Sequence, residues 1–279
     1  MPKIYWYYGL VIIGSIMLIY TVYKKKNIPD IISFFSFTTA VSWMIEGVIL
    51  FILDAYAYKP GLFQDPFAEN IIGHMIANTA LWGSTAILVM FFQISNPWLC
   101  FVSVSFMLIE EFFLKIDAYE QNWWKTYMTG IGVFLFMLVM KKWYSRFYRN
   151  GHKLHRVITF WMIAWFFIKI PTSILTVLGK VFYNVDWYDN IYRSSALYGA
   201  FVYDAFMASI FTLFVSVFKK TYWCIVPIII IVVGDIFLYY MDILTFHNGW
   251  NLIYLIIFQT LSLGLFILCE KFTLKPLHN

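Results

Sequence analysis

Long apolar runs separated by short polar segments dominate the chain. Each run has about 17 to 25 residues, which is the length an α-helix needs to cross the hydrocarbon core of a bilayer. The pattern therefore predicts an all-α bundle of about nine membrane-spanning helices in a single integral membrane domain over residues 1–279. The spans are expected at residues 5–23, 30–53, 71–94, 98–116, 126–143, 157–179, 196–218, 221–242 and 250–270.

Two predicted spans share a motif in which an acid within the span is followed by Asp-Ala-Tyr at the end of the span. The two stretches are WMIEGVILFILDAY (43–56) and MLIEEFFLKIDAY (107–119). A third, GDIFLYYMDIL (234–244), repeats in Asp235 and Asp242 the spacing of Glu110 and Asp117. Seven residues make nearly two helical turns, so we expect the two acids of each pair to share a helix face.

This similarity leads us to interpret the chain as tandem helical hairpins that follow an extra first span. The hairpins are expected at about residues 30–94, 98–143, 157–218 and 221–270. The alternative is that apolar segments resemble one another through low complexity.

Polar residues of six predicted spans fall at one depth, roughly 12 to 15 Å from the outer ends of their spans at 1.5 Å per residue. Ionisable side chains in a membrane are costly and usually face a partner or a wet cavity. We therefore expect an acidic intramembrane chamber that binds a solute or an ion. Its candidate site residues are Glu46, Glu110, Asp204, Asp235, Lys169 and Asn78.

Several neighbouring residues have simpler interpretations. Glu111 is expected to pair with Lys115 one turn on, and His74 to lie at the membrane interface. Asp235 has the alternative of bonding Tyr239 on the same span. Lys169 has the alternative of extending to the interface, although Pro171 two residues later predicts a broken span of the kind that lines transport sites.

Composition and charge narrow the class of protein. The chain is 62% hydrophobic and only 13% charged, which excludes an ordinary soluble domain. Its net charge of +5 comes from short basic loops, so nucleic acid is not an expected partner. Thirteen Lys and Arg residues fall on one side and six on the other, which predicts an outside N-terminus and a cytoplasmic C-terminus.

Sequence motifs for common catalytic chemistry are missing from the chain. It contains no P-loop, nucleophile elbow, HExxH or glycine-rich dinucleotide turn. His152 and His155 lie three residues apart in a basic loop, where a solvated loop is the expected role, so no metal site is predicted. The cofactor, if any, stays unknown, and an enzyme is the less favoured class.

The stretch FFLKIDAYEQNWWKTYMTGIGVFLFMLVMKKWY (112–144) resembles a group of uncharacterised multi-pass membrane proteins of Bacillus-type Firmicutes. These proteins carry a similar hairpin in which FLK is followed by WWKT and then KWY. The resemblance covers one hairpin, roughly an eighth of the chain. It implies a bacterial cytoplasmic-membrane protein and carries no activity with it.

The leading hypothesis for function is a transporter or permease for a cation, a proton or an amine-bearing solute. One alternative is an intramembrane enzyme that modifies a lipid, with the acids in acid–base or metal-binding roles. Another is a ligand sensor or assembly component that acts through a protein partner. Membrane lipids are expected partners in every case.

Overall fold

The structure is a computed structural model that describes residues 2–150, 153–218 and 221–274. Its contacts divide these residues into two compact units, one that ends before residue 151 and one that begins at residue 153. His152 of the basic loop lies outside the described residues, as do three of the thirteen Lys and Arg residues counted on the cytoplasmic side: Lys219, Lys220 and Lys275.

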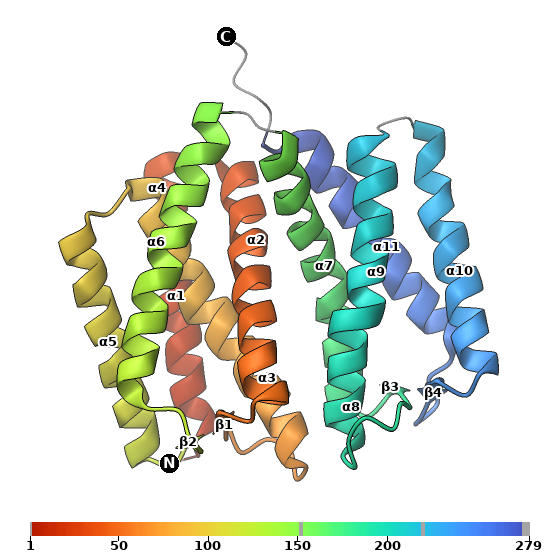
Figure 1. Cartoon of the computed structure of the whole chain (residues 1–279), viewed down its shortest axis with the longest axis horizontal. Helices are drawn as coiled ribbons and strands as arrows, with labels where there is room; N and C mark the ends of the chain where they lie inside the picture. Colours follow the sequence, from red (N-terminus) through yellow and green to blue (C-terminus); the bar gives the residue numbers. More distant parts are fainter. Residues whose placement is uncertain (1, 151–152, 219–220, 275–279) are drawn as a thin grey trace. The chain divides into compact units, whose positions relative to one another are not determined.

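The first unit consists of helices and two short strands (Figure 1). In chain order its elements are α1 (Ile4–Lys25), α2 (Ile28–Gly47), η1 (Val48–Ile52), β1 (Tyr56–Tyr58), α3 (Pro66–Ala77), η2 (Asn78–Gly83), α4 (Ser84–Phe92), α5 (Asn96–Lys115), β2 (Tyr119–Gln121) and α6 (Thr126–Asn150). Strands β1 and β2 pair antiparallel, with Tyr56 opposite Gln121 and Tyr58 opposite Tyr119.

From its first helix onward, the second unit has the same order of α-helices and strands that begins at α2, although η1 has no counterpart in it and η4 and η5 have none in the first unit. They are α7 (Lys153–Val177), β3 (Val181–Tyr183), α8 (Ile191–Tyr198), η3 (Gly199–Tyr203), α9 (Asp204–Phe211), η4 (Thr212–Val217), η5 (Thr221–Cys224), α10 (Ile225–Tyr240), β4 (Leu244–Phe246) and α11 (Leu252–Phe272). Strands β3 and β4 pair antiparallel, with Val181 opposite Phe246 and Tyr183 opposite Leu244.

A residue with left-handed backbone precedes every one of the four strands. These residues are Asp54, Asp117, Gly179 and Asp242, with φ of 48°, 56°, 64° and 56°. Asp and Gly are among the residues that adopt this conformation most readily, and it is a common way to end a helix. The repeated Asp-Ala-Tyr motif is thus the turn from a helix into a strand.

This turn corrects one expectation from the sequence. Helix α5 ends at Lys115 and α10 ends at Tyr240, so Asp117 and Asp242 lie beyond the helices. They therefore do not share a helix face with Glu110 and Asp235. Asp117 instead bonds Lys3 at 2.6 Å, which lowers the pKa of the Asp117 carboxyl from its ordinary value.

The described residues include four π-helical segments: η2 and η3 interrupt helices, whereas η1 and η4 lie at the ends of α2 and α9. The expected break at Pro171 is wrong, because α7 continues as one α-helix from Lys153 to Val177 with the proline inside it. The π segments lie beside candidate site residues: η2 begins at Asn78, and η3 ends directly before Asp204. Single π-helical turns are frequent at functional sites.

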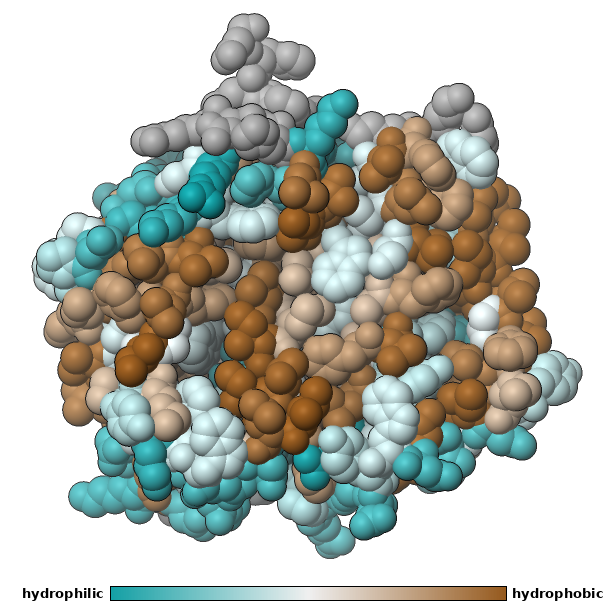
Figure 2. Space-filling view, in the orientation of Figure 1, coloured by the Kyte–Doolittle hydropathy of each residue, from teal (hydrophilic) through white to brown (hydrophobic). Residues whose placement is uncertain are grey.

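Seven helical segments of the described chain are long and apolar enough to cross a membrane. They are Ile4–Lys25, Ile28–Ile52, Pro66–Phe92, Asn96–Lys115, Lys153–Val177, Ile191–Val217 and Leu252–Phe272. The helix Ile225–Tyr240 is apolar but shorter. Apolar side chains gather over the middle of the helices and polar ones at their ends (Figure 2). The chain is therefore a multi-pass integral membrane protein built from α-helices.

Helix α1 packs very closely on the interrupted helix of the first unit. Gly14 is buried, and a Cβ atom added there would overlap the backbone carbonyl of Ala80 in η2. Small residues allow membrane helices this close approach. Near the start of α1, the Tyr7 hydroxyl donates to the carbonyl oxygen of Ala118 at 2.6 Å. This hydrogen bond joins α1 to the turn before β2.

We predict that Gly14→Ala lowers the thermal stability of the purified protein, because overpacking against a backbone atom costs roughly 1–3 kcal/mol. Gly9→Ala in the same helix is the matched control, since a Cβ atom there meets nothing within 4 Å. Alanine favours helix over glycine by about 1 kcal/mol, so the control should be neutral or stabilising. Equal melting temperatures for the two variants would show that α1 does not pack as described.

Candidate functional site

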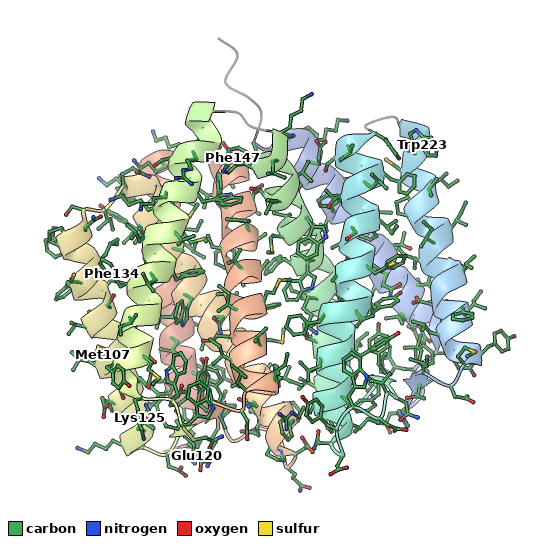
Figure 3. All side chains as sticks on the ribbon, in the orientation of Figure 1. Met107, Glu120, Lys125, Phe134, Phe147 and Trp223 are labelled. Carbon is green, nitrogen blue, oxygen red and sulfur yellow. The ribbon has the colours of Figure 1, made fainter. Side chains whose placement is uncertain are left out.

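A cavity of about 350 Å³ lies inside the first unit, between α2, η2, α5, α6 and the strands. Its polar wall is at the strand end, where two carboxylates and an amide face it from three helical segments: Glu46, Glu110 and Asn78. Figure 3 shows Glu120 and Lys125 at this end of the unit, beside a dense group of side chains. Farther from the strands the walls are mostly apolar.

The two-stranded sheet covers the polar end of this cavity. Tyr56 and Tyr58 are two residues apart on β1 and therefore point to the same face. Their cross-strand partners, Gln121 and Tyr119, point to that face as well. The ring centroid of Tyr119 lies 5.1 Å from that of Tyr56 and 5.3 Å from that of Tyr58. The pairing register thus directs three phenols and one amide toward the carboxylates.

Glu46 is buried at the centre of a hydrogen-bonded cluster. Its carboxylate accepts from the Asn78 side-chain amide at 2.6 Å and from the Tyr58 hydroxyl at 3.2 Å. The Nδ1 atom of His74 lies 3.0 Å from the same carboxylate. Burial raises the pKa of Tyr58 well above its ordinary value, so this hydroxyl stays protonated and remains a donor.

Glu110 is equally buried but has a different environment. The Gln121 side chain donates to its Oε1 at 2.6 Å, which is a neutral partner. Within the part of the chain that the structure describes, no Lys, Arg or His lies within ion-pair distance of Glu110. Glu111 next to it does not pair with Lys115 as expected, and accepts from the Thr126 hydroxyl at 2.5 Å instead.

A second polar cluster lies inside the second unit. Lys169 Nζ on α7 is 3.6 Å from Asp204 Oδ2 at the start of α9, and the Asp204 side chain is fully buried. The Thr172 hydroxyl, one turn after Lys169, donates to the same oxygen at 3.3 Å. Lys169 also donates to the carbonyl oxygen of Ala196 at 3.3 Å. Lys169 therefore stays inside the unit and does not extend to the interface.

Asp235 on α10 is fully buried in the same unit and accepts a hydrogen bond from the Tyr203 hydroxyl. The hydrogen-bond donor is therefore a tyrosine of η3. The alternative from the sequence was Tyr239, which lies on the same span as Asp235. Gln259 on α11 donates to the Tyr203 hydroxyl at 3.1 Å. Asp235, like Glu110, has no cationic side chain within ion-pair distance among the described residues.

The two units thus have a common arrangement of charge. Each contains one acid beside a basic side chain, Glu46 with His74 and Asp204 with Lys169. Among the candidate site acids, Glu110 and Asp235 have neutral hydrogen-bond partners, and they precede β2 and β4 by the same number of residues.

Several buried oxygen atoms of the second cluster have no hydrogen-bond partner among the described residues. They are Asp204 Oδ1, Asp235 Oδ2, Gln259 Oε1 and the Tyr183 hydroxyl oxygen. Unpaired buried polar atoms cost about 1–3 kcal/mol each, so a ligand that supplies protons or positive charge would be stabilised there. No group of three His, Cys, Asp or Glu in the described chain is arranged to hold a metal ion.

The structure brings the six predicted site residues together in two sets. Glu46, Asn78 and Glu110 line the cavity of the first unit. Lys169, Asp204 and Asp235 are buried in the second unit, with Lys169 close to a carboxylate as expected. A single chamber that contains all six stays a prediction.

Sequence analysis missed most of the neutral partners in these clusters. His74 was assigned to the interface but is 5% exposed and lies against Glu46. The sequence did not lead us to expect partners of the carboxylates among Tyr56, Tyr58, Tyr119 and Gln121. The alternation Tyr-Ala-Tyr after a helix end is nevertheless a signal for a strand. Comparison with known protein families, with curated proteins and with solved structures finds no match to this chain.

We predict that Lys169→Met lowers the stability of the purified protein by about 3 kcal/mol, because it leaves Asp204 buried without its counter-charge. Adding Asp204→Asn to this variant should restore part of the loss. Lys180→Met is the control in the same unit, since Lys180 Nζ has only an exposed contact to a carbonyl oxygen at 3.4 Å. Thermal unfolding measures the three variants and wild type, and equal loss in the Lys169→Met variant and the double variant would contradict the pairing.

Proposed function

We propose that this protein is a membrane transporter or permease for an amine-bearing cationic solute, which binds in the cavity of the first unit. The observation that carries the proposal is Glu110, a buried carboxylate on the cavity wall whose described neighbours include no cation. An ionised group inside a membrane protein is expensive to leave uncompensated. A cationic solute supplies the missing charge.

The rings around Glu110 support an amine over a small inorganic ion. Tyr56, Tyr58, Tyr119 and Trp124 line the same end of the cavity. Aromatic faces attract alkylammonium groups, and the attraction reaches about 2 kcal/mol in desolvated sites. Glu46 already accepts from Tyr58 and Asn78 and has a neighbouring histidine, His74. We therefore assign the ammonium group to Glu110 and a supporting role to Glu46 and Asn78.

The second unit is proposed to take a proton or an alkali cation. Carboxylate, amide and hydroxyl oxygens are ligands that hard cations prefer. Asp235 has no cationic side chain within ion-pair distance among the described residues, and its Oδ2 has no partner. Asp204 and Gln259 complete this candidate ion site, and Lys169 compensates the charge of Asp204. A solute site and an ion site in one protein are the requirements of coupled transport.

The same order of elements in the two units supports a tandem repeat. Left-handed residues recur at nearly equal intervals at Asp54, Asp117, Gly179 and Asp242, each before a three-residue strand. We infer four hairpins after α1 and nine membrane spans, with α6 and α10 as the two spans beyond the seven. Transporters are often built from such repeats. The bacterial cytoplasmic membrane is the proposed location.

We predict that butylammonium raises the melting temperature of the wild-type protein in a saturable way, by the linkage of ligand binding to folding. Glu110→Gln should abolish this shift, because the amide keeps the size of the side chain and removes its charge. Asp235→Asn, the equivalent substitution in the second unit, should keep the amine shift and lose any response to Na⁺ or K⁺. If both variants keep the amine shift, the proposal loses its basis.

The orientation has a separate prediction. Single cysteines at exposed positions in a cysteine-free background, Gln64→Cys before α3 and Arg146→Cys on α6, should label oppositely with an impermeant maleimide on intact cells. The unequal distribution of Lys and Arg places Gln64 outside and Arg146 in the cytoplasm. Labelling of Arg146→Cys from outside would reverse the proposed topology.

A further inference from the structure

The cavity of the first unit has a polar end and an apolar remainder, and the change occurs in the same direction along each helix that lines it. On α5, Ile109 and Phe106 precede Glu110 in the chain and lie toward the apolar end of the cavity. On α6, Thr129 lies at the polar end and Met140 at the other. The stretch of α6 between them spans roughly 16 Å at 1.5 Å per residue.

The apolar part is much longer than a small hydrophilic amine requires. Beyond the carboxylates the lining consists almost entirely of aliphatic and aromatic side chains, with Ser42 as a small exception. The apolar lining includes Val41, Leu81, Phe106, Leu135, Phe136, Val139 and Met140. Filling such a space with apolar groups is worth about 0.8 kcal/mol per buried CH₂.

The lining of the cavity reaches the surface of the unit on α2 and α6. These helices meet at the end far from the strands, where Phe37 and Trp143 stack with ring centroids 5.5 Å apart. Nearer the strands the cavity lies between them, and three residues of its lining are about half exposed: Ile45 at 49%, Leu135 at 52% and Val139 at 51%. An apolar chain can therefore enter this cavity across the apolar surface of the helices.

We infer that the solute is an amphiphile with a single apolar chain and an amine head, and that it enters from the lipid phase. The ammonium group bonds Glu110 beneath the tyrosines of β1 and β2, and the chain lies along α6 toward Met140. This inference rests on the proposed function, because it names the class of amine that the same site takes.

Gly132 provides a direct test of this arrangement. It lines the cavity one turn after Thr129, and a Cβ atom there meets nothing within 4 Å. Gly132→Leu should therefore fill the start of the apolar part without a clash and with a gain in helix propensity. Gly264→Leu on α11 is the matched control, since Gly264 is exposed, has the same open space and lies in the other unit.

The experiment measures thermal stability of the full-length protein in phosphatidylcholine nanodiscs with butylammonium, decylammonium and decanol. For wild type and Gly264→Leu, decylammonium should bind at least tenfold more tightly than butylammonium at equal membrane-bound concentration. Gly132→Leu should bind decylammonium at least tenfold more weakly and butylammonium within about threefold of wild type. Val139→Trp, which fills the far end, should reproduce the selective loss if Gly132→Leu does not fold.

The outcomes separate the two proposals. Equal binding of butylammonium and decylammonium, with both lost in Glu110→Gln, would overturn the amphiphile inference and leave the amine transporter standing. A shift with decanol that survives Glu110→Gln would identify a neutral lipid as occupant and overturn the inference. No shift with any amine would remove the proposed function together with it.

Discussion

A carboxylate buried among apolar side chains needs hydrogen-bond donors or a counter-charge, and this requirement organises both units of the protein. The four acids of the two polar clusters, Glu46, Glu110, Asp204 and Asp235, are at most 9% exposed. The elements around them supply the donors: phenols from strands and π segments, amides from Asn78, Gln121 and Gln259, and basic groups from His74 and Lys169. Without these partners, each acid would cost the protein several kcal/mol.

The strands and π segments have the same function in this scheme. A helix ends at a left-handed residue, and the short strand after it turns the chain so that alternate side chains point back toward the carboxylates. The π segments η2 and η3 occur where Asn78 and Asp204 face into their units. Local departures from α-helical geometry are thus concentrated where polar groups must be aligned, which is the usual location of such departures in membrane proteins.

Among the candidate site acids, Glu46 and Asp204 lie beside a basic side chain, whereas Glu110 and Asp235 have neutral hydrogen-bond donors. Glu110 and Asp235 are the acids of the second kind, and they occupy equivalent places on α5 and α10. The proposed function assigns the exchangeable sites to these two acids. The apolar cavity beside Glu110 is the feature from which we infer that the first site takes an amphiphile.

The sequence by itself determined the class of protein and the positions of the helices. Apolar length is a local property, so all nine predicted segments coincide with helical segments of the structure. Depth follows from helical rise, and so Glu46, Asn78, Lys169 and Asp204 could be named as candidates. Only the tertiary structure decided which residues meet. Tyr58 joins Glu46 through the register of two strands that lie far apart in the sequence, and Tyr203 reaches Asp235 from another helix. Spacing along one helix predicts faces of that helix alone, whereas partners across helices depend on packing and on turns such as the one at Asp117.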